Sequence, residues 1–216
     1  MTIQDNLKKV KDRIKSSALK VNRTPEEIKL IAVTKTFPVD VIKEAINLGV
    51  GSIGETKVQE AKKKFEEIGK KIEWHMIGNL QSNKAKDAVE IFDYIHSVDR
   101  MKVARKVSEC CLQLNKKMSV LVQVNVSGIT HGIKPEETVD FVNEIKKLEG
   151  IQVEGLMTIA PLVEPEKTRL YFRKLKELAL TTGLKHLSMG MSNDFEVAIE
   201  EGATMVRIGT SIFSKR

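Results

Sequence analysis

The residue with the clearest chemical potential is Lys35, which ends the apolar run at 30–34 and directly precedes a turn at 36–38. The sheet holds a lysine at the end of a buried strand in place, and desolvation there favours the neutral amine over the ammonium form. A neutral amine can attack a carbonyl, which is the chemistry of a Schiff-base lysine. The alternative is that Lys35 only extends from the strand end into solvent.

Two further segments, at 188–192 and 207–211, combine glycine with hydroxyl residues at the exits of two predicted strands. Glycine lets backbone N–H groups approach an anion, and Ser or Thr hydroxyls donate to its oxygens. The alternative is that both are ordinary turns and caps, which these residue types also favour. The candidate residues in these segments are Ser188, Gly190, Met191, Ser192, Arg207, Gly209 and Thr210.

These segments are expected to meet on one rim, where the strands of a sheet end. An amine and an anion-binding pocket on that rim favour a phosphorylated aldehyde, because the pocket holds the phosphate and the amine captures the carbonyl. Pyridoxal 5′-phosphate carries both groups. Thr56, which follows a third apolar run, adds a hydroxyl to the same rim. We therefore expect pyridoxal phosphate to be bound covalently on Lys35.

Short apolar runs alternate with helical patterns along the whole chain, after an opening amphipathic segment at 3–21. This alternation predicts parallel strands covered by helices, and eight such units predict a (β/α)8 barrel of the TIM type. We expect one domain, residues 1–216, with an extra N-terminal helix. The predicted strands are 29–34, 50–53, 72–77, 94–97, 120–126, 152–159, 186–189 and 204–208, and the clearest helices are 39–48, 57–68, 101–114, 135–148, 166–180 and 194–200.

Two other α/β arrangements are compatible with the same pattern. Periodicity alone cannot distinguish a closed barrel from an open, doubly wound sheet. Residues 49–54 also match the glycine pattern GxGxxG of dinucleotide-binding folds. That fingerprint must follow a strand and open a helix. Here the first glycine ends a helix and the strand runs through the motif, so the sequence argues against a Rossmann site.

Composition excludes several classes of protein. No apolar stretch approaches the ~20 residues that span a membrane, and the charged N-terminal segment does not resemble a signal peptide. Two adjacent cysteines, Cys110 and Cys111, cannot form a disulfide framework, which fits a reducing cytoplasm. The four histidines lack metal-ligand spacing. The net charge of +7 is spread over mixed-charge helices and aromatic residues are only 5%, so we expect no nucleic-acid platform.

The motifs at the predicted strand ends resemble those of the pyridoxal phosphate homeostasis proteins, formerly called the proline synthetase co-transcribed family. The resemblance covers nearly the whole chain. It also implies similarity to the N-terminal barrel domain of alanine racemase, which is fold type III among pyridoxal phosphate proteins. The motifs that carry it are at 31–35, 53–60, 74–84, 155–157, 187–192 and 206–210.

The resemblance implies a role for each part of the site. Lys35 would carry the cofactor, and Ser192, Gly209 and Thr210 would hold its phosphate. Arg207 would face the pyridine nitrogen. Because an arginine does not give up its proton, that nitrogen would stay unprotonated and the ring would be a poorer electron sink.

Three positions depart from the family pattern. Thr56 stands where the family usually has asparagine, so one of the two hydrogen bonds of an amide is lost there. His131 stands where a lysine is expected, and any accessory role of that lysine does not carry over. Ser214 follows Phe213 where glycine is common.

The candidate catalytic set is incomplete for an amino-acid racemase, which needs a proton donor on each face of the substrate. Lys35 can serve one face. The racemase takes its second base, a tyrosine, from a second domain of a partner subunit, whereas Tyr94 lies at the start of a predicted strand and Tyr171 in a helical pattern. Missing one of two general catalysts typically forfeits ~10²–10⁴-fold in rate. We therefore expect no catalytic residues beyond the cofactor site.

The sequence thus favours a monomeric, cytoplasmic protein that buffers or delivers pyridoxal phosphate, with dependent apoenzymes as recipients and little turnover. One alternative is a pyridoxal-phosphate-dependent racemase or decarboxylase with an unidentified base, for which His75 and His96 are the candidates. A second is a basic RNA-binding protein, for which nucleic-acid binding would be salt-sensitive.

Overall fold

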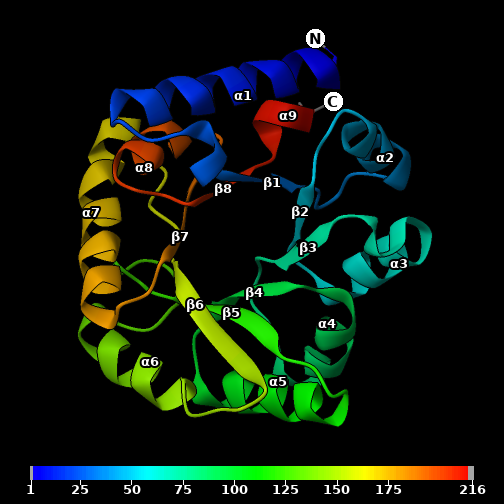
Figure 1. Cartoon of the computed structure of the whole chain (residues 1–216), viewed down its shortest axis with the longest axis vertical. Helices are drawn as coiled ribbons and strands as arrows, with labels where there is room; N and C mark the ends of the chain where they lie inside the picture. Colours follow the sequence, from blue (N-terminus) through cyan, green and yellow to red (C-terminus); the bar gives the residue numbers. More distant parts are fainter. Residues whose placement is uncertain (1, 214–216) are drawn as a thin grey trace.

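The computed structural model describes residues 2–213, so the departure at Ser214 lies outside the described residues. Within them, eight parallel strands close into a barrel in chain order, and β8 pairs with β1 (Figure 1). The predicted (β/α)8 barrel is confirmed, and the open-sheet alternative is wrong. The strands are β1 (Lys29–Val33), β2 (Ser52–Glu55), β3 (Glu73–Met76), β4 (Tyr94–Val98), β5 (Met118–Gln123), β6 (Ile151–Met157), β7 (His186–Met191) and β8 (Met205–Ile208).

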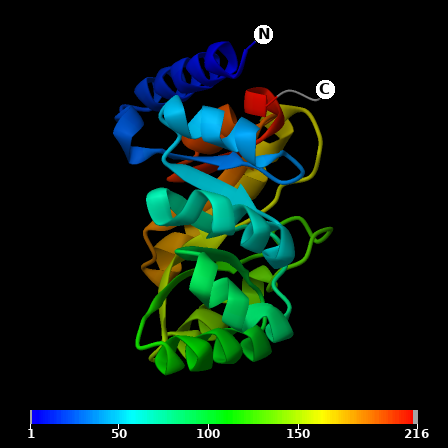
Figure 2. The same cartoon turned by 90° about the vertical axis from the view of Figure 1, so that its right-hand side faces the viewer.

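Helices surround the barrel, and Figure 2 shows α2, α3 and α4 following one another along its outside. The predicted extra N-terminal helix is α1 (Ile3–Lys20), which lies along α8 and α9. No helix among residues 2–213 is long and apolar enough to cross a membrane. The remaining helices are α2 (Val39–Asn47), α3 (Val58–Ile68), α4 (Ala85–Ile91), α5 (Met101–Gln113), α6 (Thr138–Ile145), α7 (Pro165–Thr182), α8 (Phe195–Glu200) and α9 (Thr210–Phe213).

Four predicted strands differ from the structure by two or three residues at one end or both, and two of them are shifted along the chain. The strand predicted at 50–53 is Ser52–Glu55, because Gly49, with φ +85°, ends α2 and delays the strand. This shift brings Glu55 into the barrel wall, where it is fully buried. The strand predicted at 120–126 is Met118–Gln123, and Val124 makes only an isolated bridge to Ile133. The helices α4 and α9 follow β3 and β8, as the alternation predicts, but neither was among the clearest helical patterns.

The apolar core lies mainly between the strands and the surrounding helices. Its largest fully buried side chains include Trp74, Phe172 and Phe195. Burying each such side chain contributes roughly 1.5–3 kcal/mol. The barrel interior holds a much smaller apolar cluster, formed by Ile31, Leu121, Met157 and Met205. Polar side chains occupy other positions of the interior, so the site begins inside the barrel.

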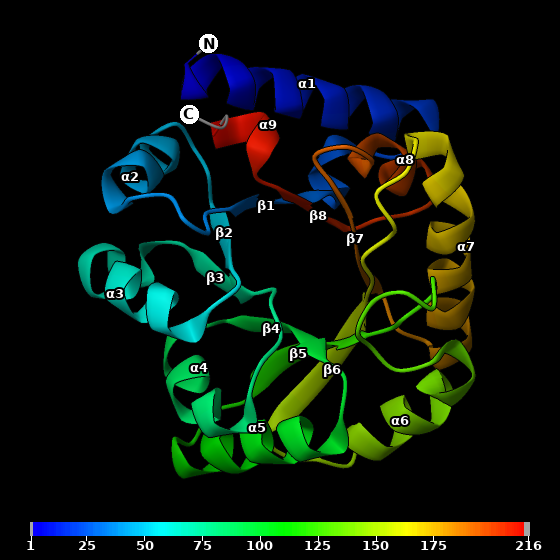
Figure 3. The same ribbon diagram turned by 180° about the vertical axis from the view of Figure 1, so that it is seen from behind.

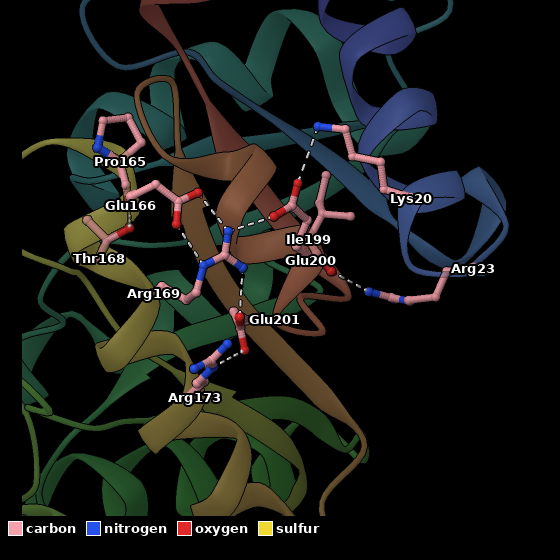
Figure 4. Close-up of polar contacts among 10 residues, drawn as sticks. All are labelled: Lys20, Arg23, Pro165, Glu166, Thr168, Arg169, Arg173, Ile199, Glu200 and Glu201. Atoms are coloured by element: carbon pink, nitrogen blue, oxygen red, sulfur yellow. Dashed lines mark hydrogen bonds and ion pairs between the residues drawn. The ribbon is translucent and has the colours of Figure 1, made fainter.

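A cluster of ion pairs joins α7 and α8, with one further link from α1 (Figure 4). Arg169 of α7 donates to Glu200, the last residue of α8, and to Glu201, which follows it, both at 2.7 Å, and to Glu166 in its own helix. Arg173 donates to the second oxygen of Glu201 at 3.0 Å. Partial burial opposes the effect, but these hydrogen bonds from Arg173 and Arg169 lower the pKa of Glu201. The cluster therefore holds the short helix α8 against α7. Helix α8 directly follows one of the candidate turns.

Replacing Arg169 with methionine should destabilise the fold by about 1–3 kcal/mol, because Glu200 and Glu201 both lose a charged donor. Urea unfolding at pH 7 measures this change. Arg173→Met is the matched control: its side chain is 62% exposed and its ion pair is with Glu201, so less than about 1 kcal/mol is expected. Equal losses in the two variants would contradict the central position of Arg169.

Candidate cofactor site

Lys35 lies in the turn between β1 and α2, and that turn is clamped on both sides of the lysine. The amine of Lys64 donates to the carbonyl oxygen of Thr34 at 2.7 Å. The backbone N–H of Thr36 donates to Glu60 Oε1 at 2.6 Å, and Thr36 adopts a left-handed φ of +67°. These two contacts fix the backbone on either side of Lys35. Lys64 and Glu60 come from α3, so the first helix after β2 holds the turn after β1.

The expectation that burial desolvates the amine of Lys35 is wrong, because the residue is exposed. β1 ends at Val33, and Lys35 stands two residues beyond it in the turn. The last fully buried residue of this segment is Thr34. The sheet therefore holds the backbone that leads to the lysine, while the side chain itself stays in contact with solvent.

A buried ion pair lies beneath this turn. Lys64 contacts Glu55 and Glu60 at 2.7 Å each, and the Thr34 hydroxyl donates to Glu55 at 2.6 Å. Burial raises the pKa of Glu55 despite the hydrogen bonds from Lys64 and Thr34, and its Oε2 atom has no hydrogen-bond partner among residues 2–213. Sequence analysis missed this pair, because an (i, i+4) Glu–Lys spacing such as that of Glu60 and Lys64 normally marks a solvated helix face.

The two candidate turns meet at the ends of β7 and β8. The backbone N–H of Ser211 points to the Ser192 hydroxyl at 3.4 Å. A hydroxyl that accepts this bond can still donate its own proton. Gly190 adopts φ +90°, and an added Cβ would lie 2.6 Å from Ala198 in α8, so only glycine fits. Met191 is held by its backbone N–H, which donates to Asp194 at 2.7 Å.

The β1 and β8 ends are also adjacent. Ala32 pairs with Ile208, and Gly209 packs against Val33, where an added Cβ would lie 3.3 Å from its carbonyl oxygen. Lys35 follows Val33 by two residues, so the lysine turn and the Gly209 turn leave neighbouring strands. Thr210, the first residue of α9, is exposed on the same rim.

Arg207 lies inside the barrel below these turns and is almost fully buried. It donates to the hydroxyl of Ser188 at 2.6 Å and to the carbonyl oxygen of Thr158 at 2.8 Å. Burial lowers the pKa of Arg207 to about 10, with Asp194 opposing the shift, so the guanidinium remains a cation at neutral pH. The structure thus brings Arg207 and Ser188 into direct contact.

A cavity of about 470 Å³ opens at the ends of β2, β3 and β4. Of the nine candidate cofactor residues, all within the described chain, Thr56 alone lines it. Lys57, Lys84 and Arg100 give the cavity a positive lining. His131 is exposed in the loop after β5, where its carbonyl oxygen accepts from Gln123. Among residues 2–213, no group of three or more potential ligands could hold a metal ion.

Sequence analysis also missed a chain of hydrogen bonds inside the barrel. It starts at Glu73, the first residue of β3, and ends at Arg207 on β8. His75 and His96, which the sequence offered only as possible bases, are its fully buried central members. The links are Glu73 Oε2 to His75 Nε2 (2.8 Å), His75 Nδ1 to His96 Nε2 (2.9 Å), His96 Nδ1 to Ser188 Oγ (2.9 Å) and Arg207 Nη1 to Ser188 Oγ (2.6 Å).

Replacing Lys64 with methionine should destabilise the protein by about 3–5 kcal/mol, because it leaves the Glu55 carboxylate buried without its cation. The double variant Glu55→Gln/Lys64→Met should recover part of this loss. Urea unfolding measures both. Lys62→Met is the matched control, since Lys62 pairs with Asp87 at the surface and its loss should cost less than about 1 kcal/mol. A Lys64→Met protein as stable as the control would contradict the buried pair.

Stability should fall as the pH drops below ~6.5, the pKa of an unfolded histidine. Burial lowers the pKa of His75, against the pull of Glu73, and lowers the pKa of His96 well below its usual range. Below ~6.5 the unfolded chain binds protons that the native protein does not, which costs up to about 1.4 kcal/mol per pH unit for each histidine.

Urea unfolding at pH 7.5, 6.5 and 5.5 checks this window, in which carboxylates with ordinary or lowered pKa values stay ionised. These two histidines together should cost less than about 1 kcal/mol between pH 7.5 and 6.5. His96→Gln should reduce the slope below pH 6.5. An unfolding free energy that is equally flat in both proteins down to pH 5.5 would contradict neutral, buried imidazoles.

Sequence comparison places the chain among known proteins. Residues 2–216 match the family model described as "Alanine racemase, N-terminal domain". A pyridoxal phosphate homeostasis protein of Aquifex aeolicus is 42% identical and covers 100% of this chain and 99% of its own length. A protein of the same name from Pseudomonas aeruginosa is 41% identical, covering 100% of this chain and 96% of its own length.

Solved structures agree with this placement. PipY of Synechococcus elongatus PCC7942, solved with pyridoxal phosphate bound, has a TM-score of 0.83 and 36% identity over 95% of this chain and 100% of its own. Alanine racemase of Clostridium difficile 630 shares the fold at a TM-score of 0.78 and 19% identity, with 100% of this chain matching 57% of the racemase. The chain therefore belongs to the pyridoxal phosphate homeostasis protein family, which is built on the barrel of the alanine racemase N-terminal domain.

Proposed function

We propose that this protein binds pyridoxal 5′-phosphate as a Schiff base on Lys35 and buffers or delivers it to dependent apoenzymes. The observation that carries the proposal is the meeting of the Lys35 and Gly209 turns at the ends of neighbouring strands. The 36% identity to PipY, solved with this cofactor bound, supports the choice of ligand.

The donor groups present fit each part of the cofactor. Ser192, Gly209 and Thr210 would hold the phosphate, since their turns offer hydroxyls and a glycine backbone that an anion can approach. Gly190 and Met191 would shape the adjoining turn, and Thr56 would contribute one hydroxyl from β2. When bound, the cofactor supplies an aldehyde that an amine can capture.

Arg207 would face the pyridine nitrogen, with Ser188 beneath it. Its guanidinium remains protonated at neutral pH, so it would donate to that nitrogen and leave it without a proton. An aspartate in this place would instead favour the protonated ring. This choice of residue limits electron withdrawal by the cofactor and fits a protein that holds it rather than uses it.

The surroundings of the site support a carrier over a racemase or decarboxylase. Both ring nitrogens of His75 and of His96 are occupied by hydrogen bonds within the barrel. Tyr94 is the first residue of β4 and stacks on His75, so it lies towards the foot of the barrel. The histidines that the sequence offered as a second base are therefore committed to structural contacts. We propose little or no turnover of amino acids.

Lys35→Ala should abolish the covalent label that borohydride fixes on the wild-type protein incubated with pyridoxal phosphate. The wild type should also absorb at about 420 nm, as expected for a lysine Schiff base of this cofactor. Absorbance spectra and peptide mass spectrometry measure both effects. Lys57→Ala is the matched control, because Lys57 is an exposed lysine of the same rim.

The control should keep both the band and the label on Lys35. A wild-type label on another lysine would refute the Lys35 assignment. Steady racemisation or decarboxylation of amino acids by the loaded protein would refute the carrier function and leave the cofactor site standing.

A further inference from the structure

The interior of this barrel departs from the usual packing of the fold. TIM barrels are generally filled by layers of branched apolar side chains. Here His75, His96 and Ser188 are each fully buried, and each hydrogen-bonds to the next. Desolvating three polar side chains opposes folding unless their bonds are satisfied. The chain crosses the barrel from β4 to β7, which are not neighbours in the sheet, so it is more than a local contact.

The chemistry of its two ends fixes the direction of this chain. An ionised Glu73 can only accept, and Arg207 can only donate. Burial acts against ionisation of Glu73, but hydrogen bonds from His75 and Lys29 lower its pKa to about 2. His75 must therefore donate from Nε2 to Glu73, which leaves Nδ1 of a neutral ring as an acceptor.

The remaining links follow from this first one. His96 must donate from Nε2 to the open Nδ1 of His75, and its own Nδ1 then accepts. Ser188 must direct its hydroxyl proton to His96 and use an oxygen lone pair for Arg207. One arrangement of protons satisfies every link, and it runs from Arg207 through Ser188, His96 and His75 to Glu73.

Burial opposes the reverse arrangement, whereas the nearby charges are mixed: Glu73 and Asp93 favour a charged His75 and Lys29 disfavours it. Running it backwards requires His75 to carry a second proton, so that both of its nitrogens donate. A charged imidazole would have to be fully buried, with Lys29 beyond Glu73 and Arg207 at the far end of the hydrogen bonds, and burial lowers the pKa of His75 despite its contact with Glu73. Tyr94 stacks on His75 with 4.9 Å between ring centroids and excludes water from that face. Glu73 is the one carboxylate in this hydrogen-bond chain, and Lys29 and Ser52 also donate to it.

We propose that Glu73, His75, His96 and Ser188 are positioning residues that hold the Arg207 guanidinium in one orientation through a hydrogen-bond chain of fixed direction. The lower end is anchored at the foot of the barrel, where Lys29, Ser52 and Glu73 are the first residues of their strands. The consequence for cofactor binding rests on the function proposed above. If Arg207 contacts the pyridine nitrogen, then the hydrogen-bond chain determines how well the guanidinium is aligned with that nitrogen.

The first experiment needs no cofactor. Long-range ¹H–¹⁵N correlation spectra of the histidine-labelled protein at pH 7 report the tautomer of each ring. His75 and His96, assigned from His75→Gln and His96→Gln spectra, should both be neutral and carry the proton on Nε2. A proton on Nδ1 of either ring, or a charged ring, would overturn the proposal whether or not the protein binds pyridoxal phosphate.

The second experiment measures the apparent dissociation constant and absorbance band of pyridoxal phosphate in matched variants. His96→Leu breaks the chain and should weaken binding about tenfold, the equivalent of one lost hydrogen bond at ~1.4 kcal/mol. His96→Gln retains a donor and an acceptor and should recover most of the affinity. His186→Leu, a histidine of β7 outside the chain, should bind as the wild type does.

The outcomes test the hydrogen-bond chain and the cofactor site independently. If His96→Leu fails to fold, Ser188→Ala replaces it, because this change cuts the link to Arg207 and leaves both rings in place. Wild-type affinity and an unchanged band in the variant that breaks the chain would overturn the proposal. Equal losses in His96→Leu and His96→Gln would do so as well. Absence of binding by the wild type would refute the proposed function, and the tautomers would still decide the chain.

Discussion

The hydrogen bonds between β1 and β8 are the constraint on which the candidate site depends. They join the first strand of the barrel to the last, and their register sets Ala32 beside Ile208. Lys35 and Gly209, which are far apart in the sequence, therefore lie in turns that leave the sheet side by side. A slip of register would move the lysine turn relative to the glycine turn and reverse which side chains face the barrel interior.

Below that rim, much of the barrel interior is occupied by polar side chains with defined hydrogen-bond partners rather than by apolar packing. Apolar side chains in the interior would require no hydrogen-bond partners and would pack well. The interior instead holds a buried arginine, two histidines and a carboxylate, each with a partner. Beside β1, the pair of Lys64 and Glu55 repeats this choice on the outer side of the sheet. Both arrangements contribute to a defined geometry more than to net stability.

The architecture follows from the sequence because each strand is an apolar run and each helix is punctuated. The strand ends were predicted to within two or three residues, so Lys35 and the glycine turns fell on one rim, with Arg207 inside the barrel below them. The environment of Lys35 was not predictable, because one residue at a strand end separates burial from exposure. Nor was the hydrogen-bond chain, since His75 and His96 lie 21 residues apart on strands whose relative register depends on tertiary packing.

The exposure of Lys35 bears on chemical selectivity. An amine in contact with water is open to condensation with any small aldehyde that diffuses to it, sugars and metabolic carbonyl compounds included. Adducts of aldehydes without a phosphate would have no group to engage the turns after β7 and β8 (Figure 3). Discrimination among aldehydes would then depend on those turns. The lysine itself would react with many aldehydes, and an adduct would persist only when the turns also hold its phosphate.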